Sequence, residues 1–429
     1  MKKTLKKYIL SISLVSSIMS GCAQHERFPD DDIIDNSNFE YLTKWEEGYL
    51  DIHQISTGRG NCTFIIMPDG TTMMVDVGDL GDAARLTQEI MPAVPNLSKR
   101  PAEWIHAYIK NFIEPTGKDW LDYVMITHFD PDHIGFTDRL AISNPNRPYK
   151  LTGVSHLAEL IDIKLLVDRG WPDYNYPDVG RFNAEHIDNY IKYANYRHAQ
   201  GKPIEGFIAG TKDQFKLLHS PQKYPDFEIR NIYANGRIWT GSGSNTRELF
   251  PAISSLPTSQ YPNENRCSNV FTLKYGAFDY FSGGDIIGVI TANQPSWYDM
   301  ETPIGELIGP MDVVLTNHHS FSDAMNANFI RSTKPQAFII PVWDYYHPQP
   351  DPLARMLSED LYAGHREIYA AGLVKNNATR LGDPGKKIKP SGHIVTRVYA
   401  GGEKFQIFVL NERSTQYEII YKSDIFNSK

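Results

Sequence analysis

The sequence is poor in cysteine and has no excess of hydrophobic residues over an ordinary globular chain. Hydrophobic residues make up 41% and charged residues 22% of its 429 residues, a balance that excludes a disordered chain and a membrane protein with many spans. Only three residues are cysteines, and with Cys22 set aside the other two could form at most one disulfide. Because Cys62 and Cys267 lie in or beside apolar, strand-like runs, we expect two buried free thiols.

The N-terminus has the features of a targeting signal. Four lysines precede an apolar segment at 8–18 that is too short to span a membrane as a mature helix, and a small-residue site, MSGC, ends at Cys22. The pattern resembles a bacterial lipoprotein signal, with residues 1–21 removed and Cys22 lipidated; an ordinary secretory signal is the alternative. The acidic segment 22–45 is then expected to tether the protein to the lipid bilayer. Because Ala23 does not resemble an inner-membrane retention residue, we expect a bacterial membrane lipoprotein on the periplasmic or cell-surface side, at the outer membrane in a Gram-negative cell.

Basic residues are scarce relative to acidic ones. The chain has 43 Lys and Arg against 51 Asp and Glu, and residues 1–21 contain four of the lysines and no acidic residue. The processed chain would therefore carry 39 basic and 51 acidic residues, a net charge of −12. Nonspecific nucleic-acid binders draw their affinity largely from neutralising phosphates. Nucleic acid is therefore not expected as the main partner, and a small-molecule or ester substrate is favoured.

The sequence does contain a repeated pattern of apolar strands that end in polar residues. Apolar runs separated by glycine turns predict strands in two blocks, which begin near residues 48 and 267. Helical periodicity is found at 82–92, 102–113 and 183–199. Strands alternating with helices predict an α/β sandwich, with one domain at 46–429. The segment 172–262 is rich in Tyr, Asn, Gly and Pro, and we expect an insertion or long connection that either shapes the substrate cleft or only elaborates the surface.

The densest group of metal-competent side chains lies in the sequence THFDPDHIG at 127–135. This loop directly follows an apolar strand and contains His128, Asp130, Asp132 and His133. A loop after a rigid strand can direct alternate side chains at one point, and a divalent metal needs several N or O donors within about 2.0–2.2 Å. Asp285 and His318 come at similar strand ends. The spacing predicts a site for two adjacent divalent ions; the alternative is an acidic turn with incidental histidines.

The motif HFDPDH resembles the HxHxDH signature of the metallo-β-lactamase-fold hydrolase superfamily, and the resemblance covers nearly the whole processed chain. Asp76 in MMVDVG matches the aspartate of the first motif, Asp285 in FSGGDI matches the aspartate that bridges both metals, and NHHS matches the fifth motif. Within the superfamily, NRCSNVFTL, HHSFS and YYHP are similar to the ComEC-type hydrolase domain. The resemblance implies an α/β fold, an αββα sandwich of two mixed β-sheets flanked by helices, with two divalent ions.

Several positions depart from the family pattern or leave a choice open. Asp130 replaces the second histidine of the signature, and this additional oxygen ligand favours Mn²⁺ as well as Zn²⁺. The third-motif histidine has no clear match, and His156 in GVSHL and Asp168 in LLVDRGW are the candidates. His318 is expected to bind metal because it comes first after its strand, and His319 to contact the substrate or to orient a ligand.

Two residues of the first block are expected beneath the site. Asp76 is a candidate ligand or a residue that supports the ligands, and His53 is a ligand, a donor to Asp76 or a buried core histidine. In addition, Ser320 stands where the ComEC-type HHGS motif has glycine, which leaves the local turn open.

These residues together predict a membrane-anchored hydrolase in which a metal-activated water attacks a phosphodiester or similar ester. Asp132 is expected to act as ligand and proton acceptor, and His347 in YYHP to reach the leaving group or an oxyanion from the opposite wall, although a structural role for His347 is an equal alternative. A lactone or β-lactam hydrolase and a non-catalytic binding lipoprotein remain as other functions. Lactone and lactam hydrolases of this fold usually keep HxHxDH and a clear third-motif histidine, and a non-catalytic protein would have no reason to keep so many matching positions.

Overall fold

The computed structural model describes residues 39–81, 91, 93–137, 141–177 and 184–429. The predicted signal peptide, Cys22 and, apart from residue 91, the helix expected at 82–92 lie outside these residues. From Glu40 to Lys429 the chain forms one unit, and that unit is described below.

The first sheet has ten strands, drawn from the first block, the segment 172–262 and the C-terminus. Its order is β19-β18-β17-β1-β2-β3-β4-β7-β8, with β20 paired to β18. The strands β3, β4, β7 and β8 run parallel, so their carboxyl ends meet at one edge of the sheet. The bounds are β1 (Leu50–Gln54), β2 (Thr63–Ile66), β3 (Thr72–Val75), β4 (Trp120–Met125), β7 (Asp162–Asp168), β8 (Ile204–Gly206), β17 (His393–Val398), β18 (Lys404–Leu410), β19 (Ile419–Lys422) and β20 (Phe426–Asn427).

The second sheet has eight strands in the order β11-β10-β9-β12-β13-β14-β15-β16. Its strands β13 to β16 are parallel, which again brings their carboxyl ends to one edge. The bounds are β9 (Phe227–Ala234), β10 (Arg237–Trp239), β11 (Thr246–Glu248), β12 (Val270–Tyr275), β13 (Phe278–Ser282), β14 (Val313–Leu315), β15 (Ala337–Pro341) and β16 (Glu367–Ala371).

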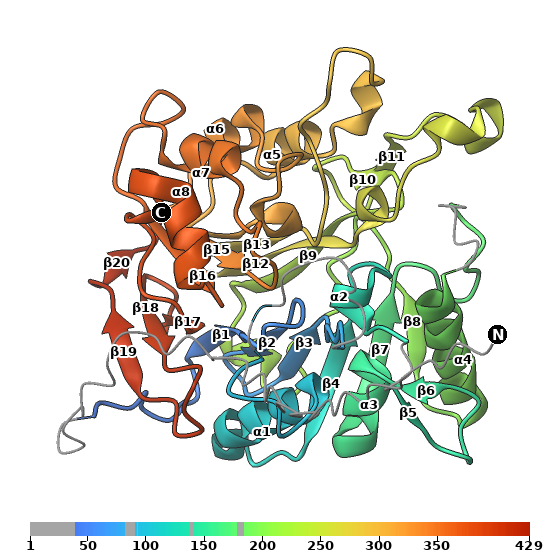
Figure 1. Cartoon of the computed structure of the whole chain (residues 1–429), viewed down its shortest axis with the longest axis horizontal. Helices are drawn as coiled ribbons and strands as arrows, with labels where there is room; N and C mark the ends of the chain where they lie inside the picture. The colour runs from blue at the N-terminus through green and yellow to red at the C-terminus, as the bar shows by residue number, and fades with distance from the viewer. Residues whose placement is uncertain (1–38, 82–90, 92, 138–140, 178–183) are drawn as a thin grey trace, which may run out of the picture. The chain divides into compact units, whose positions relative to one another are not determined.

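Helices cover the outer face of each sheet (Figure 1). The first sheet packs against α1 (Pro101–Ile113), α3 (Gly153–Leu160) and α4 (Glu185–Ala199). The second packs against α5 (Glu301–Ile308), α6 (Ala327–Thr333), α7 (Pro350–Leu357) and α8 (Lys375–Gly385). The inner faces of both sheets share a third apolar cluster, which includes Ile65, Met73, Phe271 and Leu315. The predicted αββα sandwich is therefore confirmed. The short helix α2 (Pro131–Ile134) and the small hairpin of β5 (Ile142–Ser143) and β6 (Lys150–Leu151) complete the described elements of these kinds.

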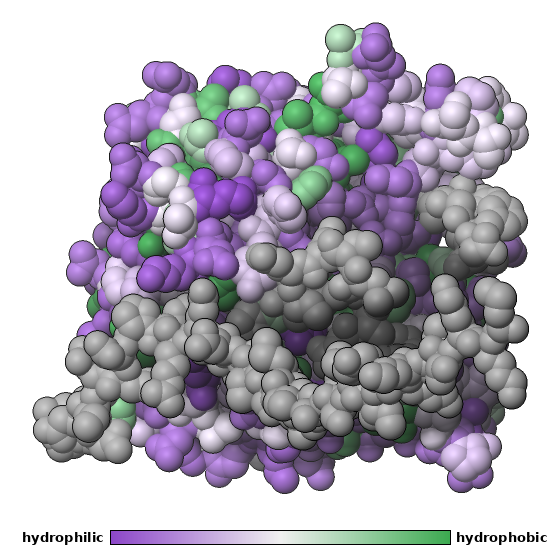
Figure 2. All heavy atoms as spheres, in the orientation of Figure 1, coloured by the Kyte–Doolittle hydropathy of each residue, from purple (hydrophilic) through white to green (hydrophobic). Residues whose placement is uncertain are grey.

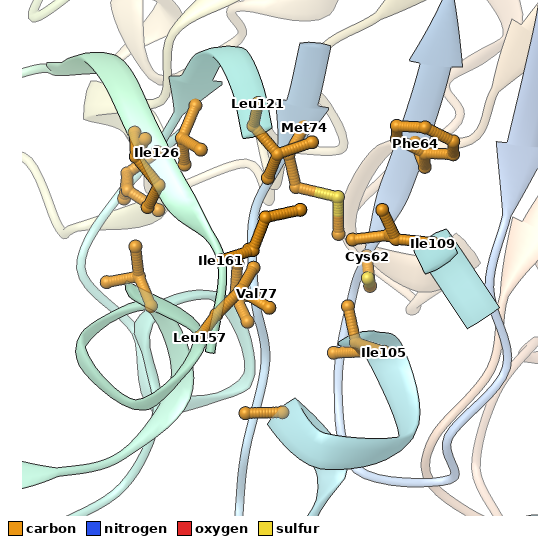
Figure 3. Packing of buried hydrophobic residues seen from close by; sticks show 14 of the residues in the cluster. Cys62, Phe64, Met74, Val77, Ile105, Ile109, Leu121, Ile126, Leu157 and Ile161 are labelled. Atoms are coloured by element: carbon orange, nitrogen blue, oxygen red, sulfur yellow. The ribbon is translucent and has the colours of Figure 1, made fainter. Parts of the chain in front are cut away.

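Helix α1 shows how the sequence builds the outer layers. Pro101 occupies its first turn, and the backbone N–H of Arg100 donates to the Glu103 carboxylate at 2.8 Å, which caps the N-terminus. Buried side chains recur every three or four residues, including Ala102, Ile105, Ile109 and Ile113. Figure 3 shows Ile105 and Ile109 facing Phe64 and Met74 of the sheet. Burying each such isoleucine contributes about 1.5–3 kcal/mol, so packing fixes the helix on the sheet that carries the site loops.

Two segments differ from their sequence interpretation. Residues 40–45, assigned to the tether, pack onto the domain, because Trp45 is buried in the first core and Lys422 pairs with Glu40 at 2.8 Å. The segment 172–262 supplies α4, an edge strand of the first sheet and β9 between β10 and β12 of the second. It therefore contributes to both sheets as well as connecting them. Its irregular, aromatic-rich sequence did not mark those strands.

The remaining global expectations concern cysteines and membrane segments. Cys62 and Cys267 are free and buried, as the sequence predicted. Within the described residues, no helix combines the length and apolar character that crossing a membrane requires. Hydrophilic residues cover most of the described part of the face seen in Figure 2, and hydrophobic residues appear there as small separate groups.

Candidate metal centre

The predicted site residues meet where the carboxyl ends of the parallel strands of both sheets face each other. The loop after β4 carries His128 to His133, the loop after β13 carries Asp285, and the loop after β14 carries the adjacent histidines. The turn GRGN lies against the first loop, and a Cβ atom at Gly60 would stand 2.4 Å from the Asp132 carbonyl oxygen. That oxygen accepts a hydrogen bond from the Asn61 N–H at 2.7 Å. Only glycine allows this backbone approach, which fixes the position of Asp132.

Four buried side chains form the closest group. Asp132, His133, Asp285 and His319 each offer one ligand atom, and these atoms lie within 4.8 Å of one another. His319 Nε2 is 2.9 Å from Asp132 Oδ2 and 3.3 Å from Asp285 Oδ2. His133 Nε2 is 3.3 Å from an oxygen of each carboxylate. We call these four residues the inner group.

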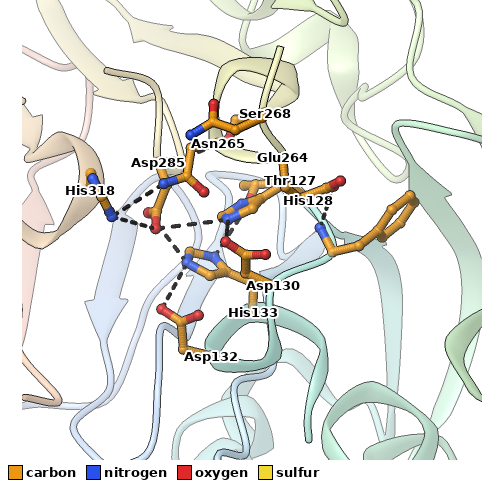
Figure 4. A network of polar contacts seen from close by, with 12 residues as sticks. Thr127, His128, Asp130, Asp132, His133, Glu264, Asn265, Ser268, Asp285 and His318 are labelled. Carbon is orange, nitrogen blue, oxygen red and sulfur yellow. Dashed lines mark hydrogen bonds and ion pairs between the residues drawn. The ribbon is translucent and has the colours of Figure 1, made fainter. Parts of the chain in front are cut away.

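A second, more open group surrounds the same aspartate. His128 Nε2 lies 3.5 Å from Asp130 Oδ2 and 3.8 Å from Asp285 Oδ2, and His318 Nε2 lies 4.0 Å from Asp285 Oδ2. Figure 4 shows His318 and His128 approaching Asp285 from two sides. We call His128, Asp130 and His318, with the shared Asp285, the outer group.

The donor set fits divalent metal ions. The Nε2 atoms of His128 and His133 are buried and have no hydrogen-bond partner among the described residues. Leaving such atoms unpaired away from water is costly, whereas imidazole nitrogens converging with carboxylate oxygens satisfy Zn²⁺ or Mn²⁺. The residues that would hold the metal ions are therefore the four of the inner group together with His128, Asp130 and His318 of the outer group.

Charge coupling ties the inner group together. Burial lowers the pKa of His133, but Asp285, Asp132 and Asp76 outweigh burial and raise it well above its usual value. Burial likewise opposes the neighbouring carboxylates at His319, where the pKa rises to about 9. Although burial raises the pKa of Asp132 and Asp285, the histidines hold both well below the usual range. Metal binding must therefore displace protons from these imidazoles near neutral pH.

Asp76 orients the inner group through hydrogen bonds with His133 and Thr127. Its Oδ2 accepts a hydrogen bond from His133 Nδ1 at 2.7 Å and from the Thr127 hydroxyl at 2.8 Å, and its Oδ1 accepts from the Thr127 N–H at 2.7 Å. Asp76 adopts a left-handed φ of 60°. Of the two roles expected for Asp76, the structure places it as the acceptor that fixes the ligand histidine.

The loop that carries HFDPDH is also held by residues without a motif of their own. The Phe129 N–H donates to Glu264 Oε1 at 2.8 Å, and Arg169 pairs with Glu264 at 2.6 Å. The Arg169 guanidinium lies over the Phe129 ring at 4.5 Å. The sequence did not predict either residue, because Arg169 and Glu264 lie 95 positions apart and such a pair produces no local motif. The only signal was the proximity of Glu264 to the NRCSN segment.

The adjacent histidines lie in a strained turn. His318, His319 and Ser320 have φ values of 43°, 51° and 57°, a conformation that costs of the order of 1–3 kcal/mol for each non-glycine residue. The turn is held in part by buried Glu301, which accepts hydrogen bonds from the Asn317 amide at 2.8 Å and the Met325 N–H at 2.6 Å. Ser320 thus adopts the conformation expected of the glycine that it replaces.

The strained turn brings His319 as well as His318 to the site. We expected His318 to be the ligand and His319 to contact substrate or orient a ligand, but His319 is the residue within the inner group. His318 reaches Asp285 from the outer side. The strand alternation on which the expectation relied ends at Leu315, and the left-handed turn directs both rings toward the aspartate.

His347 borders the inner group. Its ring stacks on His319 with centroids 4.8 Å apart, and the Trp343 ring lies 5.0 Å away. Burial, together with His319 and His318, holds the pKa of His347 well below its usual value. The expected position beside the site is therefore occupied by a neutral imidazole.

Three candidate residues lie away from the metal ligands. Asp168 accepts hydrogen bonds from the N–H groups of Gly170 and Trp171 and from the hydroxyls of Tyr174 and Tyr190. These four bonds explain its place at the end of β7, so the ligand role considered for it is not supported by its contacts. His156 is buried in α3, where burial lowers its pKa and the charge of Asp79 is the largest opposing influence.

His53 belongs to the core rather than to the ligand set. Its Nδ1 lies 3.0 Å from the Tyr108 hydroxyl, and its ring contacts those of Phe64 and Phe112. His53 therefore packs in the aromatic core instead of donating to Asp76, as the third of its expected roles proposed.

The same core predicts acid sensitivity. Burial lowers the pKa of His53 to about 4 and that of His393 to about 3, while both would titrate near 6.5 in the unfolded chain. Neutral imidazoles in the folded state give stability that is fully present above pH 6.5 and is lost as pH falls toward 4. Between pH 6.5 and 5 we expect a loss of about 2 kcal/mol per histidine. Urea unfolding of wild type and His53→Gln over this range measures it; equal slopes for both proteins would contradict the assignment.

Comparison with known proteins bears on the first block. Residues 55–154 match the family model described as the Metallo-beta-lactamase superfamily, a range that contains Asp76 and the loop from His128 to His133. A search of curated proteins finds no match. Matching solved structures include a protein from Parabacteroides distasonis that carries the name metal-dependent hydrolase, at 11% identity and a TM-score of 0.36, covering 79% of this chain and 100% of that chain. Zn²⁺-bound PqqB from Methylobacterium extorquens matches at 9% identity and a TM-score of 0.32, covering 74% of this chain and 98% of that chain. Both TM-scores lie below 0.5, which is too low for either similarity to assign a role to this chain.

Proposed function

Because this chain carries a metallo-beta-lactamase superfamily domain, with the buried donor set of a metal-dependent hydrolase, we propose that it hydrolyses a phosphodiester or a similar ester with two divalent ions, Zn²⁺ or Mn²⁺. The closer similarity to the ComEC-type domain remains a prediction from the sequence motifs, and the proposed hydrolase function does not depend on it.

The observation that carries the proposal is the place of Asp285 between the two groups. Its carboxylate lies 3.3 Å from His133 and His319, and 3.8–4.0 Å from His128 and His318. A carboxylate shared in this way suits two adjacent ions. Two divalent metal ions bound side by side would lower the pKa of a coordinated water and stabilise the attacking and leaving oxygens of an in-line displacement. Three carboxylates in the ligand set, Asp130, Asp132 and Asp285, also favour hard, oxygen-preferring ions.

The chain's own groups would orient the substrate and receive the proton. Asp132 is the acceptor we propose for the proton of the attacking water, because its carboxylate lies within the inner group. His347 would face the leaving oxygen from beside His319. Since its pKa is held well below the usual value, it would donate a hydrogen bond as a neutral imidazole rather than transfer a proton as an acid.

The experiment is metal analysis of the full-length chain followed by hydrolysis of a substrate panel. The panel contains activated phosphodiesters, phosphomonoesters, lactones and β-lactams, each with and without chelator. Slow, chelator-sensitive cleavage of small phosphodiesters is the expected result. Preference for a lactone or β-lactam would replace the proposed substrate class, and metal binding without any hydrolysis would favour a binding protein.

Because the processed chain has a net charge of −12, DNA binding should be weak and strongly salt-dependent. Tight binding of DNA at physiological salt would instead favour nucleic acid as the substrate.

We also propose that the protein is anchored to the lipid bilayer through Cys22, on the periplasmic or cell-surface side. The support is the MSGC site after a basic and apolar N-terminal segment. Cys22→Ser should abolish labelling by a fatty-acid analogue and release the protein from the membrane fraction. Labelling that persists in the variant would place the anchor elsewhere.

A further inference from the structure

The histidines around Asp285 share one arrangement of their two ring nitrogens. His133 Nδ1 faces Asp76 at 2.7 Å, His319 Nδ1 faces the Pro341 carbonyl oxygen at 2.9 Å, and His318 Nδ1 faces Asp323 at 2.7 Å. An oxygen acceptor at Nδ1 fixes the proton there and leaves the Nε2 lone pair for a metal. In all three residues Nε2 then points toward Asp285 (Figure 4 shows His133 and His318). His318 is therefore prepared in the same way as the two histidines of the inner group.

The outer group also contains a buried ring nitrogen whose hydrogen-bonding capacity no described residue satisfies. His128 is fully buried, and its Nε2 has no hydrogen-bond partner among the described residues. Asp130 Oδ2 and Asp285 Oδ2 lie 3.5 and 3.8 Å from this nitrogen, separations that ligands of one metal ion commonly show when each is bound at about 2.0–2.2 Å. On the far side of Asp285, His318 Nε2 faces the same oxygen at 4.0 Å. An ion bound among these atoms would satisfy both imidazole nitrogens and the shared carboxylate.

The backbone explains how two consecutive residues can serve two positions. In regular structure, adjacent side chains diverge, but the left-handed φ values of 43° at His318 and 51° at His319 turn both rings toward Asp285. Their ring centroids remain 6.2 Å apart with the planes inclined at 59°. Strain of this kind, held by Glu301 through Asn317, is typical of functional sites.

We propose that the two adjacent histidines bind different ions. His319 completes the inner position with Asp132, His133 and Asp285, whereas His318 completes an outer position with His128, Asp130 and Asp285. His318 thereby supplies the ligand for which the sequence has no third-motif histidine, and Asp323 is the positioning residue that orients it. Asn265, whose amide lies 3.2 Å from His318 Nε2, would yield this nitrogen to the ion. The inference rests on the proposed metal-dependent function.

The test is metal stoichiometry rather than activity. The full-length chain is stripped of metal, titrated with Co²⁺, and analysed for bound metal and for the visible absorption of each bound ion. Wild type should bind two ions. His318→Asn, chosen because asparagine tolerates a left-handed backbone, should bind one ion and keep the spectrum of the inner position. His319→Asn should instead lose the inner position. Asp323→Asn should weaken only the second ion, by about 10–100-fold. The exposed His365 provides the control His365→Asn, which should bind two ions.

The outcomes separate this inference from the proposed function. Two ions with unchanged affinity in folded His318→Asn would overturn it, and so would a single ion in saturated wild type. If wild type binds two ions and His318→Asn binds one, while no panel substrate is hydrolysed, the ligand assignment stands and the proposed function fails. If phosphodiesters are cleaved and His318→Asn retains both ions, only the ligand assignment fails.

Discussion

Asp285→Asn is expected to lower the rate of hydrolysis by about 10²-fold or more, the scale of removing a principal electrostatic group, and to reduce bound metal at the same time. The amide keeps the shape of the carboxylate but removes the negative charge shared by both groups. His133 and His319 lie 3.3 Å from its oxygens, and the pKa of His133 is raised by the Asp285 carboxylate against the effect of burial. Neither an ion nor a protonated imidazole would have this compensation in the variant.

The measurement compares metal content and turnover of wild type and Asp285→Asn, with circular dichroism to establish folding. Asp279→Asn is the matched control, because Asp279 lies on the same strand β13 but its carboxylate pairs with Lys274 and its backbone N–H donates to Asp312. The control should keep both metal content and rate. A folded Asp285→Asn protein with full metal and full rate would remove Asp285 from the site and with it the two-ion proposal.

The part of the site that the sequence could predict is the part encoded by local spacing. His128, Asp130, Asp132 and His133 follow one strand within six positions, so their convergence needs no knowledge of distant residues. Asp285 could be placed because an apolar strand and a glycine turn precede it in the same way. For these residues, strand-end position is a physical property that parallel sheets convert directly into proximity.

Strand-end position alone also produced the candidates that lie elsewhere. Asp168 ends β7 as Asp285 follows β13, but Tyr174, Tyr190 and two N–H groups satisfy its carboxylate. His53 points into a packed aromatic core. Whether a polar side chain at such a position faces the cleft depends on partners that are distant in sequence, and one sequence does not reveal them.

Backbone conformation limited the remaining predictions. The place of His319 among the ligands, beside His318, arises from three successive left-handed residues, which no residue type in NHHS demands. The roles of Glu264 and Asp323 as partners of a loop N–H and a ring nitrogen likewise depend on tertiary placement. The αββα fold was predictable because its alternating strands and helices extend over most of the chain, whereas β9 lies in a segment without clear periodicity.

The second large effect is expected from Asp76→Asn, a change that leaves every metal ligand in place. Asparagine tolerates the φ of 60° found at this position, but its single amide oxygen cannot serve both the Thr127 N–H at Oδ1 and the three donors at Oδ2, which are His133, the Thr127 hydroxyl and the Asn61 amide. With its oxygen toward these three donors, the asparagine would still accept from His133 Nδ1, now 2.7 Å from a carboxylate oxygen, but without the negative charge. A neutral amide holds the Nδ1 proton less firmly than a carboxylate does and makes Nε2 a weaker ligand for the ion.

Asp76→Asn should therefore weaken the inner ion by about 10–100-fold, with excess metal restoring part of the activity. A titration of metal-free protein measures the affinity, and denaturant unfolding measures stability separately. Asp168→Asn is the matched control, since Asp168 is also buried at the end of a parallel strand of the same sheet but bonds Tyr174 and Tyr190. The control should lose about 1–3 kcal/mol of stability through weakened buried hydrogen bonds while keeping its metal affinity. Unchanged metal affinity in Asp76→Asn would mean that the negative charge of Asp76 does not contribute to binding of the inner ion.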